Sequence, residues 1–112
     1  MKSNRLNEYK IMWVMVFFDL PTETKTQRKA YTDFRKRLIA DGFTMFQFSI
    51  YMRSCASMEN AQVHVNRISK ILPKEGKVCI MTITDRQFRD IKIFEGVDRT
   101  KPLTGAVQLE LF

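Results

Sequence analysis

The sequence predicts a mixed α+β fold in which a small sheet carries two helices on one face. Three observations lead to this prediction: short apolar runs typical of strands, two segments with helical spacing between them, and turn residues at the boundaries. The elements follow the order strand, helix, strand, strand, helix, strand. This order is typical of the ferredoxin-like arrangement, an antiparallel sheet with both helices on the same side.

The first strand is predicted from eight consecutive apolar residues that begin at Ile11 and lead into a single carboxylate, Asp19. The run is long enough for a strand covered on both faces and too short to cross a membrane. Pro21 ends it, because proline has no N–H to donate to a sheet. On these residues alone, two roles fit Asp19: a hydrogen-bonded turn cap, or a metal-binding or catalytic carboxylate.

A helix is predicted over residues 25–41. Thr24 and Gln27 have the spacing of a capping box, and Gly42 suits a left-handed helix end. The stripe expected to pack on the sheet consists of Gln27, Tyr31, Phe34 and Leu38. A neighbouring basic arc consists of Lys25, Arg28, Lys29, Arg35 and Lys36. This arc is either a solvated helix face or a surface that contacts phosphates.

An alternating segment, residues 43–53, is expected to form the second and third strands, with a corner near Gln47. One side of the alternation consists of Phe46, Phe48, Ile50 and Met52, and the other of Gln47, Ser49, Tyr51 and Arg53. No segment matches the RNA-recognition motif that places stacking aromatics on central strands. Phe46 and Phe48 are therefore expected in the core.

A second helix is predicted from Met58 to Leu72, with Ser57 as its N-cap and Pro73 as its stop. Its expected apolar stripe is Met58, Ala61, Val65, Ile68 and Leu72. His64 lies at the edge of this stripe and is expected to be a boundary side chain, since no acid or cysteine has a supporting spacing. Lys77 to Thr84 is the predicted fourth strand.

The chain changes character after the fourth strand. Residues 91–94 are expected to form a short added strand, and residues 95–105 a polar linker with glycine and proline. In residues 106–112, an apolar row is formed by Val107, Leu109 and Leu111. We expect this segment to dock as a strand on a sheet edge of its own dimer or of another protein; a frayed tail is the alternative. We expect residues 1–10 to be an N-terminal extension and residues 11–94 to form the domain.

The net charge of +7 over 112 residues favours polyanionic partners. No basic amphipathic helix has an aromatic-rich opposite face, which argues against a membrane partner. No signal peptide is recognised, so a cytoplasmic location is expected. Cys55, Cys79 and His64 supply too few ligands for a zinc site, and both cysteines are expected to be buried or half-buried.

The sequence contains no serine-hydrolase elbow, no phosphate-binding loop and no cluster of carboxylates. Asp19 alone would bind magnesium weakly, because this ion generally uses one or two carboxylates in an octahedral site. A two-fold dimer that brought together Asp19 of both chains would supply two carboxylates. A sheet face without helices also favours a homodimer.

Four segments together resemble the CRISPR-associated protein 2 family. They are VMVFFDLPTET around Asp19, RKAYTDFRKRLIADGF from Arg28 to Phe43, FQFSIYMR at 46–53, and ITDRQF at 83–88. The resemblance covers roughly residues 12–94 and is strongest to members from systems with a single large effector nuclease.

The resemblance implies a homodimer whose strand-end aspartates share a magnesium ion, with Asp19 as ligand and candidate catalytic residue. It also implies a structural role in spacer acquisition, in which the dimer bridges dimers of the CRISPR-associated integrase and holds an incoming double-stranded DNA fragment. We favour this role over its alternative, a magnesium-dependent endonuclease for single-stranded RNA or double-stranded DNA. The nucleic-acid contacts that we expect are Lys25, Arg28, Lys29, Arg35, Lys36, Arg53 and Arg86.

Overall fold

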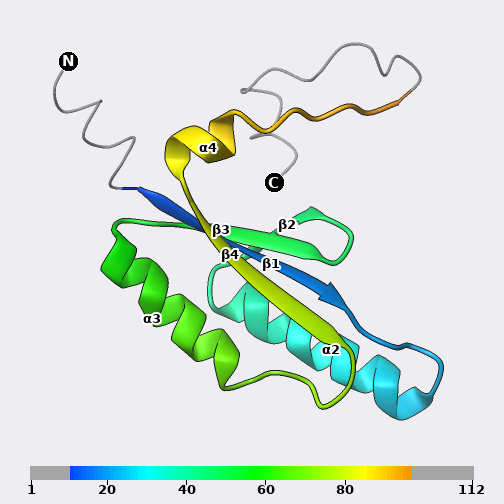
Figure 1. Ribbon diagram of the computed structural model, residues 1–112. Coiled ribbons are helices and arrows are strands. Elements are labelled where there is room, and N and C mark those ends of the chain that lie inside the picture. Colours follow the sequence, from blue (N-terminus) through cyan, green and yellow to red (C-terminus); the bar gives the residue numbers. More distant parts are fainter. Residues whose placement is uncertain (1–10, 97–112) are drawn as a thin grey trace, which may run out of the picture.

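The computed structural model describes residues 11–96 and has the predicted order of elements (Figure 1). A four-stranded antiparallel sheet has the order β2-β3-β1-β4 and consists of β1 (Met12–Asp19), β2 (Thr44–Gln47), β3 (Ile50–Cys55) and β4 (Lys77–Thr84). Two helices, α2 (Lys25–Ala40) and α3 (Met58–Ser69), lie on the same face of this sheet. The fold is therefore α+β, with the ferredoxin-like sequence of strands and helices.

The central strand β1 is covered on both faces, as its continuous apolar run predicts. Alternate residues of β1 face the helices: Met12, Val14, Val16 and Phe18. They pack against Phe34 and Leu38 of α2 and Ala61 and Ile68 of α3. The intervening residues Trp13, Met15 and Phe17 belong to a second apolar cluster on the opposite face. This two-sided burial explains why eight apolar residues precede the first exposed carboxylate.

The start of α2 is fixed by the capping box that the sequence predicts. The Thr24 hydroxyl accepts a hydrogen bond from the Gln27 main-chain N–H (3.1 Å), and the Gln27 side-chain oxygen accepts one from the Thr24 N–H (3.0 Å). The helix ends at Ala40, one residue before the predicted end, and Gly42 follows with φ +89°. This left-handed conformation favours glycine.

The hairpin between β2 and β3 corrects one expectation about the core. Its corner lies at Phe48 and Ser49, close to the predicted position near Gln47. Phe46 and Ile50 pack on the second cluster, but the Phe48 side chain is 79% exposed. The assignment of Phe48 to the core was wrong because the alternating pattern continues through the turn, where a side chain no longer follows the sheet.

The Ser57 N-cap of α3 is confirmed by a 3.0 Å hydrogen bond from the Asn60 N–H to the Ser57 hydroxyl. The helix ends at Ser69, so the predicted end at Leu72 was three residues too late. Met58 and Leu72 are exposed, whereas His64 is only 5% exposed. The expectation of a boundary position for His64 is therefore wrong.

A short helix, α4 (Asp85–Arg89), follows β4 and is not among the elements predicted from the sequence. Its Phe88 packs against Met15 and Met52 on the sheet face opposite α2 and α3. The Trp13 ring stacks on Phe88 with centroids 3.9 Å apart, and its indole N–H donates to Asp85 Oδ1 (2.8 Å). This face is therefore covered in part by the chain itself, which corrects the expectation of a bare face.

The added strand predicted at residues 91–94 does not form. Instead the N–H groups of Asp90 and Ile91 donate to main-chain carbonyls of α4. The N-terminal extension 1–10, the linker from residue 97 onward, and the docking segment with Val107, Leu109 and Leu111 lie outside the described residues.

Candidate nucleic-acid and metal site

Asp19 is the last residue of β1, and it is exposed, as predicted from its place after the apolar run. Strand alternation places it on the face of Trp13, Met15 and Phe17, opposite the two long helices. Its partner in the sheet register is Lys77 of β4. The carboxylate is thus solvent-accessible and has a cationic residue on the neighbouring strand.

Two turns hold the main chain around Asp19. The N–H of the preceding residue, Phe18, donates to the Ser49 carbonyl at the β2–β3 corner (3.0 Å). On the other side lies Gly76, whose φ is +87°; a Cβ at this position would lie 2.6 Å from the Asp19 carbonyl oxygen. Glycine is therefore needed at residue 76, and the end of β1 is fixed in position between the two turns.

The chemistry of Asp19 suits magnesium, but one chain supplies too few ligands. A carboxylate is a hard oxygen donor of the kind that this ion prefers. Within residues 11–96, no group of three or more His, Cys, Asp or Glu residues is placed to hold a metal ion. The described residues therefore form at most part of a magnesium site around Asp19, and sharing of the ion with a second chain stays a prediction.

The basic arc predicted on α2 is exposed to solvent in all five members. Four of these residues line a shallow groove of about 630 Å³ together with Thr26, Thr32 and Asp33; the four are Lys25, Arg28, Lys29 and Lys36. The structure therefore brings most of the predicted phosphate-contacting residues together on a single helix face.

Three residues of the arc also serve the fold. Arg28 donates to the main-chain carbonyls of Thr22 (3.2 Å) and Glu23 (2.9 Å). The Lys29 ammonium lies 2.9 Å from an Asp33 carboxylate oxygen, and this hydrogen bond lowers the pKa of Asp33. The Arg35 Nε donates to the Tyr51 hydroxyl (2.6 Å). These contacts limit the freedom of the arginine side chains on α2.

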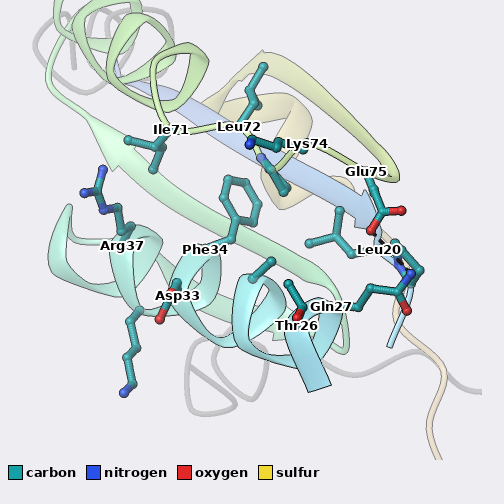
Figure 2. Close-up of a pocket in the computed structure, with 14 residues that line it drawn as sticks. Leu20, Thr26, Gln27, Asp33, Phe34, Arg37, Ile71, Leu72, Lys74 and Glu75 are labelled. Atoms are coloured by element: carbon teal, nitrogen blue, oxygen red, sulfur yellow. Dashed lines mark hydrogen bonds between the residues drawn. The ribbon is translucent and has the colours of Figure 1, made fainter. Parts of the chain in front are cut away.

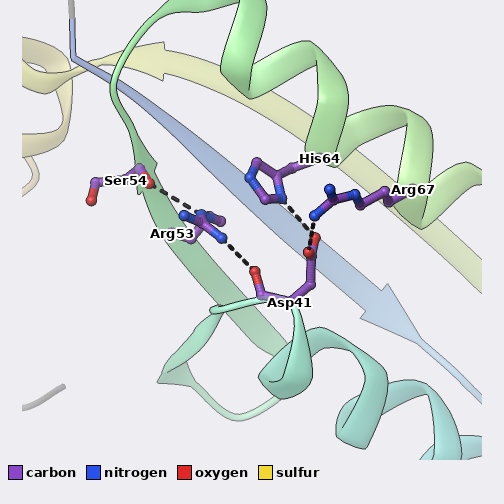
Figure 3. A network of polar contacts seen from close by, with 5 residues as sticks. All are labelled: Asp41, Arg53, Ser54, His64 and Arg67. Carbon is purple, nitrogen blue, oxygen red and sulfur yellow. Dashed lines mark hydrogen bonds and ion pairs between the residues drawn. The ribbon is translucent and has the colours of Figure 1, made fainter.

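The remaining two predicted nucleic-acid contacts lie apart from this groove. Arg53 is half-buried on β3 and donates to the main-chain carbonyls of Asp41 and Ser54 (Figure 3). Arg86 lies on α4, which packs on the sheet face opposite α2. Neither Arg53 nor Arg86 therefore lies on the basic face of α2.

A polar network centred on Asp41 was missed by sequence reasoning. Its carboxylate lies 2.7 Å from His64 Nδ1 and accepts a 2.8 Å hydrogen bond from Arg67 (Figure 3). Burial raises the pKa of Asp41, but the contacts with His64 and Arg67 outweigh burial, and the pKa is lowered. The partners are 23 and 26 residues away in the sequence, so no local spacing pattern could have revealed them.

A larger groove of about 760 Å³ lies between α2 and the segment that joins α3 to β4 (Figure 2). Its apolar lining includes Leu20, Phe34 and Ile71. Charges of both signs also line it, from Asp33, Arg37, Lys74 and Glu75. This mixed lining shows neither the uniform charge of a phosphate site nor a set of convergent catalytic groups.

The other sequence expectations concern the cysteines and membranes. Cys55 is buried, and burial raises the pKa of its thiol, whereas Cys79 is exposed, contrary to expectation. Within residues 11–96, none of the helices has the length and apolar character needed to cross a bilayer.

Comparison with known proteins assigns the family. Residues 12–91 match the family described as CRISPR associated protein Cas2. The chain is 55% identical over 108 residues to a protein of Flavobacterium psychrophilum named CRISPR-associated endoribonuclease Cas2, with coverage of 96% of this chain and 94% of that protein. It is 52% identical over 101 residues to a protein of the same name from Parvibaculum lavamentivorans, covering 90% of this chain and all of that protein. The chain therefore belongs to the CRISPR-associated protein Cas2 family.

Proposed function

We propose that this chain is the structural subunit of a CRISPR spacer-acquisition complex, in which its homodimer bridges integrase dimers and holds the incoming DNA fragment. The observation that carries this proposal is the exposed cationic groove on α2, lined by Lys25, Arg28, Lys29 and Lys36. Cations on a rigid helix bind phosphates whatever the base sequence, which is what a holder of diverse DNA fragments needs.

The described residues are better suited to holding phosphates than to cleaving them. Metal-assisted hydrolysis of a phosphodiester needs several oxygen ligands around the ion. Within residues 11–96 a single chain offers Asp19, next to Lys77 on the neighbouring strand, and no cluster of three metal-ligating side chains. Hydrolysis thus depends on a second chain, whereas the basic groove of α2 is complete within one chain. The groups present in the described residues therefore favour the structural role over a hydrolytic role.

A homodimer through the sheet face opposite α2 and α3 is part of the proposal. Met81 on this face is 45% exposed, Cys79 is exposed, and Phe17 and Ile50 are half-buried. Such an apolar surface is typical of a protein interface. Because Asp19 lies on the same face, a two-fold contact there would also bring two Asp19 residues toward each other.

We further propose that residues 106–112 dock as a strand on the integrase. Within the described residues, the outer strands β2 and β4 each pair on one side only, so a second copy of this chain also offers sheet edges, and truncation of the segment distinguishes the two partners. A chain truncated after Thr104 should remain dimeric and bind the integrase at least about tenfold more weakly, an effect of ~1.4 kcal/mol. Equal affinity of the truncated chain would contradict this role, and a loss of dimer stability would place the segment within the homodimer.

DNA holding is tested by replacing Lys25 and Lys36 together with Gln. These two lysines line the groove without the main-chain contacts that Arg28 makes, so the fold should be retained. The affinity for a blunt DNA duplex should fall for every sequence, and the slope of log affinity against log salt should flatten by roughly two units. A matched control replaces Lys70 and Lys92, which are exposed outside α2. Equal slopes for the two double variants would refute the proposal.

A magnesium-dependent endonuclease is the second candidate function. It is favoured by the exposed carboxylate of Asp19 at the end of β1 and by the word endoribonuclease in the names of the two relatives. In this alternative, Asp19 from each of two chains would hold one magnesium ion, which when bound supplies an activated water. The basic groove of α2 would then position the phosphodiester backbone of a single-stranded RNA or a DNA duplex.

A further inference from the structure

Phe48 at the β2–β3 corner is the most exposed large apolar side chain of the described residues, at 79%. A single exposed apolar residue is common on protein surfaces and alone indicates nothing. What distinguishes Phe48 is the structure behind it: contacts hold the backbone of the corner, an aromatic ring of α2 packs against Phe48, and two arginines lie on the same side of that helix.

The backbone at the corner is held in an unfavourable conformation. Ser49, next to Phe48, has φ +63°, a left-handed value that residues other than glycine seldom adopt. Two contacts maintain it: the Ser49 hydroxyl lies 3.3 Å from the Tyr31 hydroxyl, and the Ser49 carbonyl accepts a hydrogen bond from the Phe18 N–H. Strain that the surroundings maintain in this way is often found at functional sites.

An aromatic ring supports Phe48 from one side. The rings of Tyr31 and Phe48 are nearly parallel, with an angle of 23° and centroids 6.1 Å apart. Tyr31 in turn contacts Phe18 of the core, with centroids 5.7 Å apart. The Phe48 ring is thus anchored through Tyr31 while most of its surface remains open to a further planar group.

Two arginines of α2 share the side of the helix that carries Tyr31. Arg28 precedes Tyr31 by three residues and Arg35 follows it by four, so both lie on the same side of the helix as Tyr31. Arg28 is held by the carbonyls of Thr22 and Glu23, and Arg35 by the hydroxyl of Tyr51. The helix face behind the Tyr31–Phe48 pair therefore carries two cations whose side chains are held in position.

We propose that Phe48, supported by Tyr31, stacks on an unpaired nucleobase of a single-stranded nucleic acid whose phosphates contact Arg28 and Arg35. An open aromatic ring beside backbone-binding cations is the arrangement used to bind single strands. The bases inside a duplex are already stacked and offer no free face, so the ligand is a single strand or an unpaired end. The inference rests on the nucleic-acid-binding part of the proposed function and adds the class of strand bound.

The test compares Phe48→Ala, Phe48→Trp and wild type in binding a single-stranded DNA of about ten nucleotides that contains 2-aminopurine. Phe48→Ala should lose at least about fivefold in affinity and most of the fluorescence quenching, whereas Phe48→Trp should keep both. Binding of a blunt duplex should change by less than about twofold. Ile39→Ala, which removes another exposed apolar side chain from α2, is the matched control and should match wild type.

Three outcomes would overturn the inference. The first is unchanged single-strand affinity in Phe48→Ala. The second is an equal loss for single strand and duplex, which would indicate a general effect on phosphate binding. The third is unchanged nucleic-acid binding with weaker self-association or integrase binding, which would assign Phe48 to a protein interface. Duplex holding by Lys25 and Lys36 is measured separately, so either proposal can fail while the other stands.

Discussion

Asp41 Oδ2 lies 2.7 Å from His64 Nδ1, and this contact joins the C-terminal end of α2 to the middle of α3. The other carboxylate oxygen accepts from Arg67, and the main-chain carbonyl of Asp41 accepts from Arg53 of β3. One residue therefore connects two helices and a strand. Because His64 is buried, it needs a polar partner, and Asp41 supplies it. The network fixes the end of the helix that carries the basic groove.

Replacement of Asp41 by Asn should lower the free energy of unfolding by about 1–3 kcal/mol near neutral pH, because charge-assisted hydrogen bonds are lost. Because the pKa of Asp41 is lowered, the stabilisation by its carboxylate depends on pH. The carboxylate contributes its stabilisation above its ordinary pKa, near 4, and loses it as the pH falls through the lower folded value. Urea unfolding should therefore show the difference between wild type and variant shrinking below about pH 4.

Asp33→Asn is the control for this pH effect. Asp33 also has a lowered pKa, but it is an exposed side chain whose partner is the exposed Lys29. The Asp33→Asn variant should lose far less stability than Asp41→Asn, since surface ion pairs contribute little. A difference between wild type and Asp41→Asn that stays constant from neutral pH to about pH 3 would contradict the assigned role of the Asp41 carboxylate.

Phe88→Ala tests whether α4 is an integral part of the domain. The side chain is buried against Met15, Met52 and the stacked ring of Trp13, so its removal should cost about 3 kcal/mol or more. The fluorescence of Trp13, the only tryptophan, should also change. Phe94→Ala is the control, because Phe94 is exposed and should cost about 0.5 kcal/mol or less. A loss for Phe88→Ala as small as the loss expected for the control would show that α4 does not stabilise the fold.

The elements that the sequence predicts correctly are those whose structure is decided by local chemistry. The apolar run predicted β1 and the exposed position of Asp19, and the Thr24 capping box predicted the first residue of α2. The same capping pattern occurs at Thr84 and Gln87 and could have revealed α4. The helix that begins after Thr84 has only five residues, too few for a periodic apolar pattern, and the apolar residues 91–94 favour a strand instead.

The features that were not predicted depend on contacts between distant segments. His64 and Asp41 meet because α2 and α3 lie side by side on the sheet, and nothing near either residue in the sequence signals the other. Lys77 becomes the neighbour of Asp19 only through the register of β1 with β4. Phe48 leaves the core because the corner begins one residue after Gln47, in a segment without glycine or proline to mark it.

The proposed dimer predicts a mass close to twice 13.3 kDa by light scattering at micromolar concentration. Met81→Glu would place a charge in the proposed interface without opening a core cavity, since Met81 is half-exposed. The dimer should then weaken at least about tenfold, because burying an unpaired charge is costly. Ile39→Glu places the same charge on α2 and should leave the dimer intact. A monomeric wild type, or equal dimerisation of both variants, would remove this interface and the shared-metal arrangement with it.

Asp19→Asn separates the structural role from the endonuclease role. The residue is exposed beyond the apolar run, so the change should cost at most ~1 kcal/mol of stability. Any cleavage of single-stranded RNA or duplex DNA that rises in a magnesium titration should be abolished, because the amide cannot replace a charged oxygen ligand.

Glu23→Gln, which changes an exposed carboxylate of the same loop region, should leave such cleavage intact. Duplex affinity and assembly with the integrase should be unchanged in the Asn variant, because the basic groove of α2 does not include Asp19. The decisive measurement is spacer acquisition in cells. If acquisition persists in Asp19→Asn, the chain acts through its structure; if acquisition is lost while the complex still assembles, the carboxylate is required and a purely structural role is refuted.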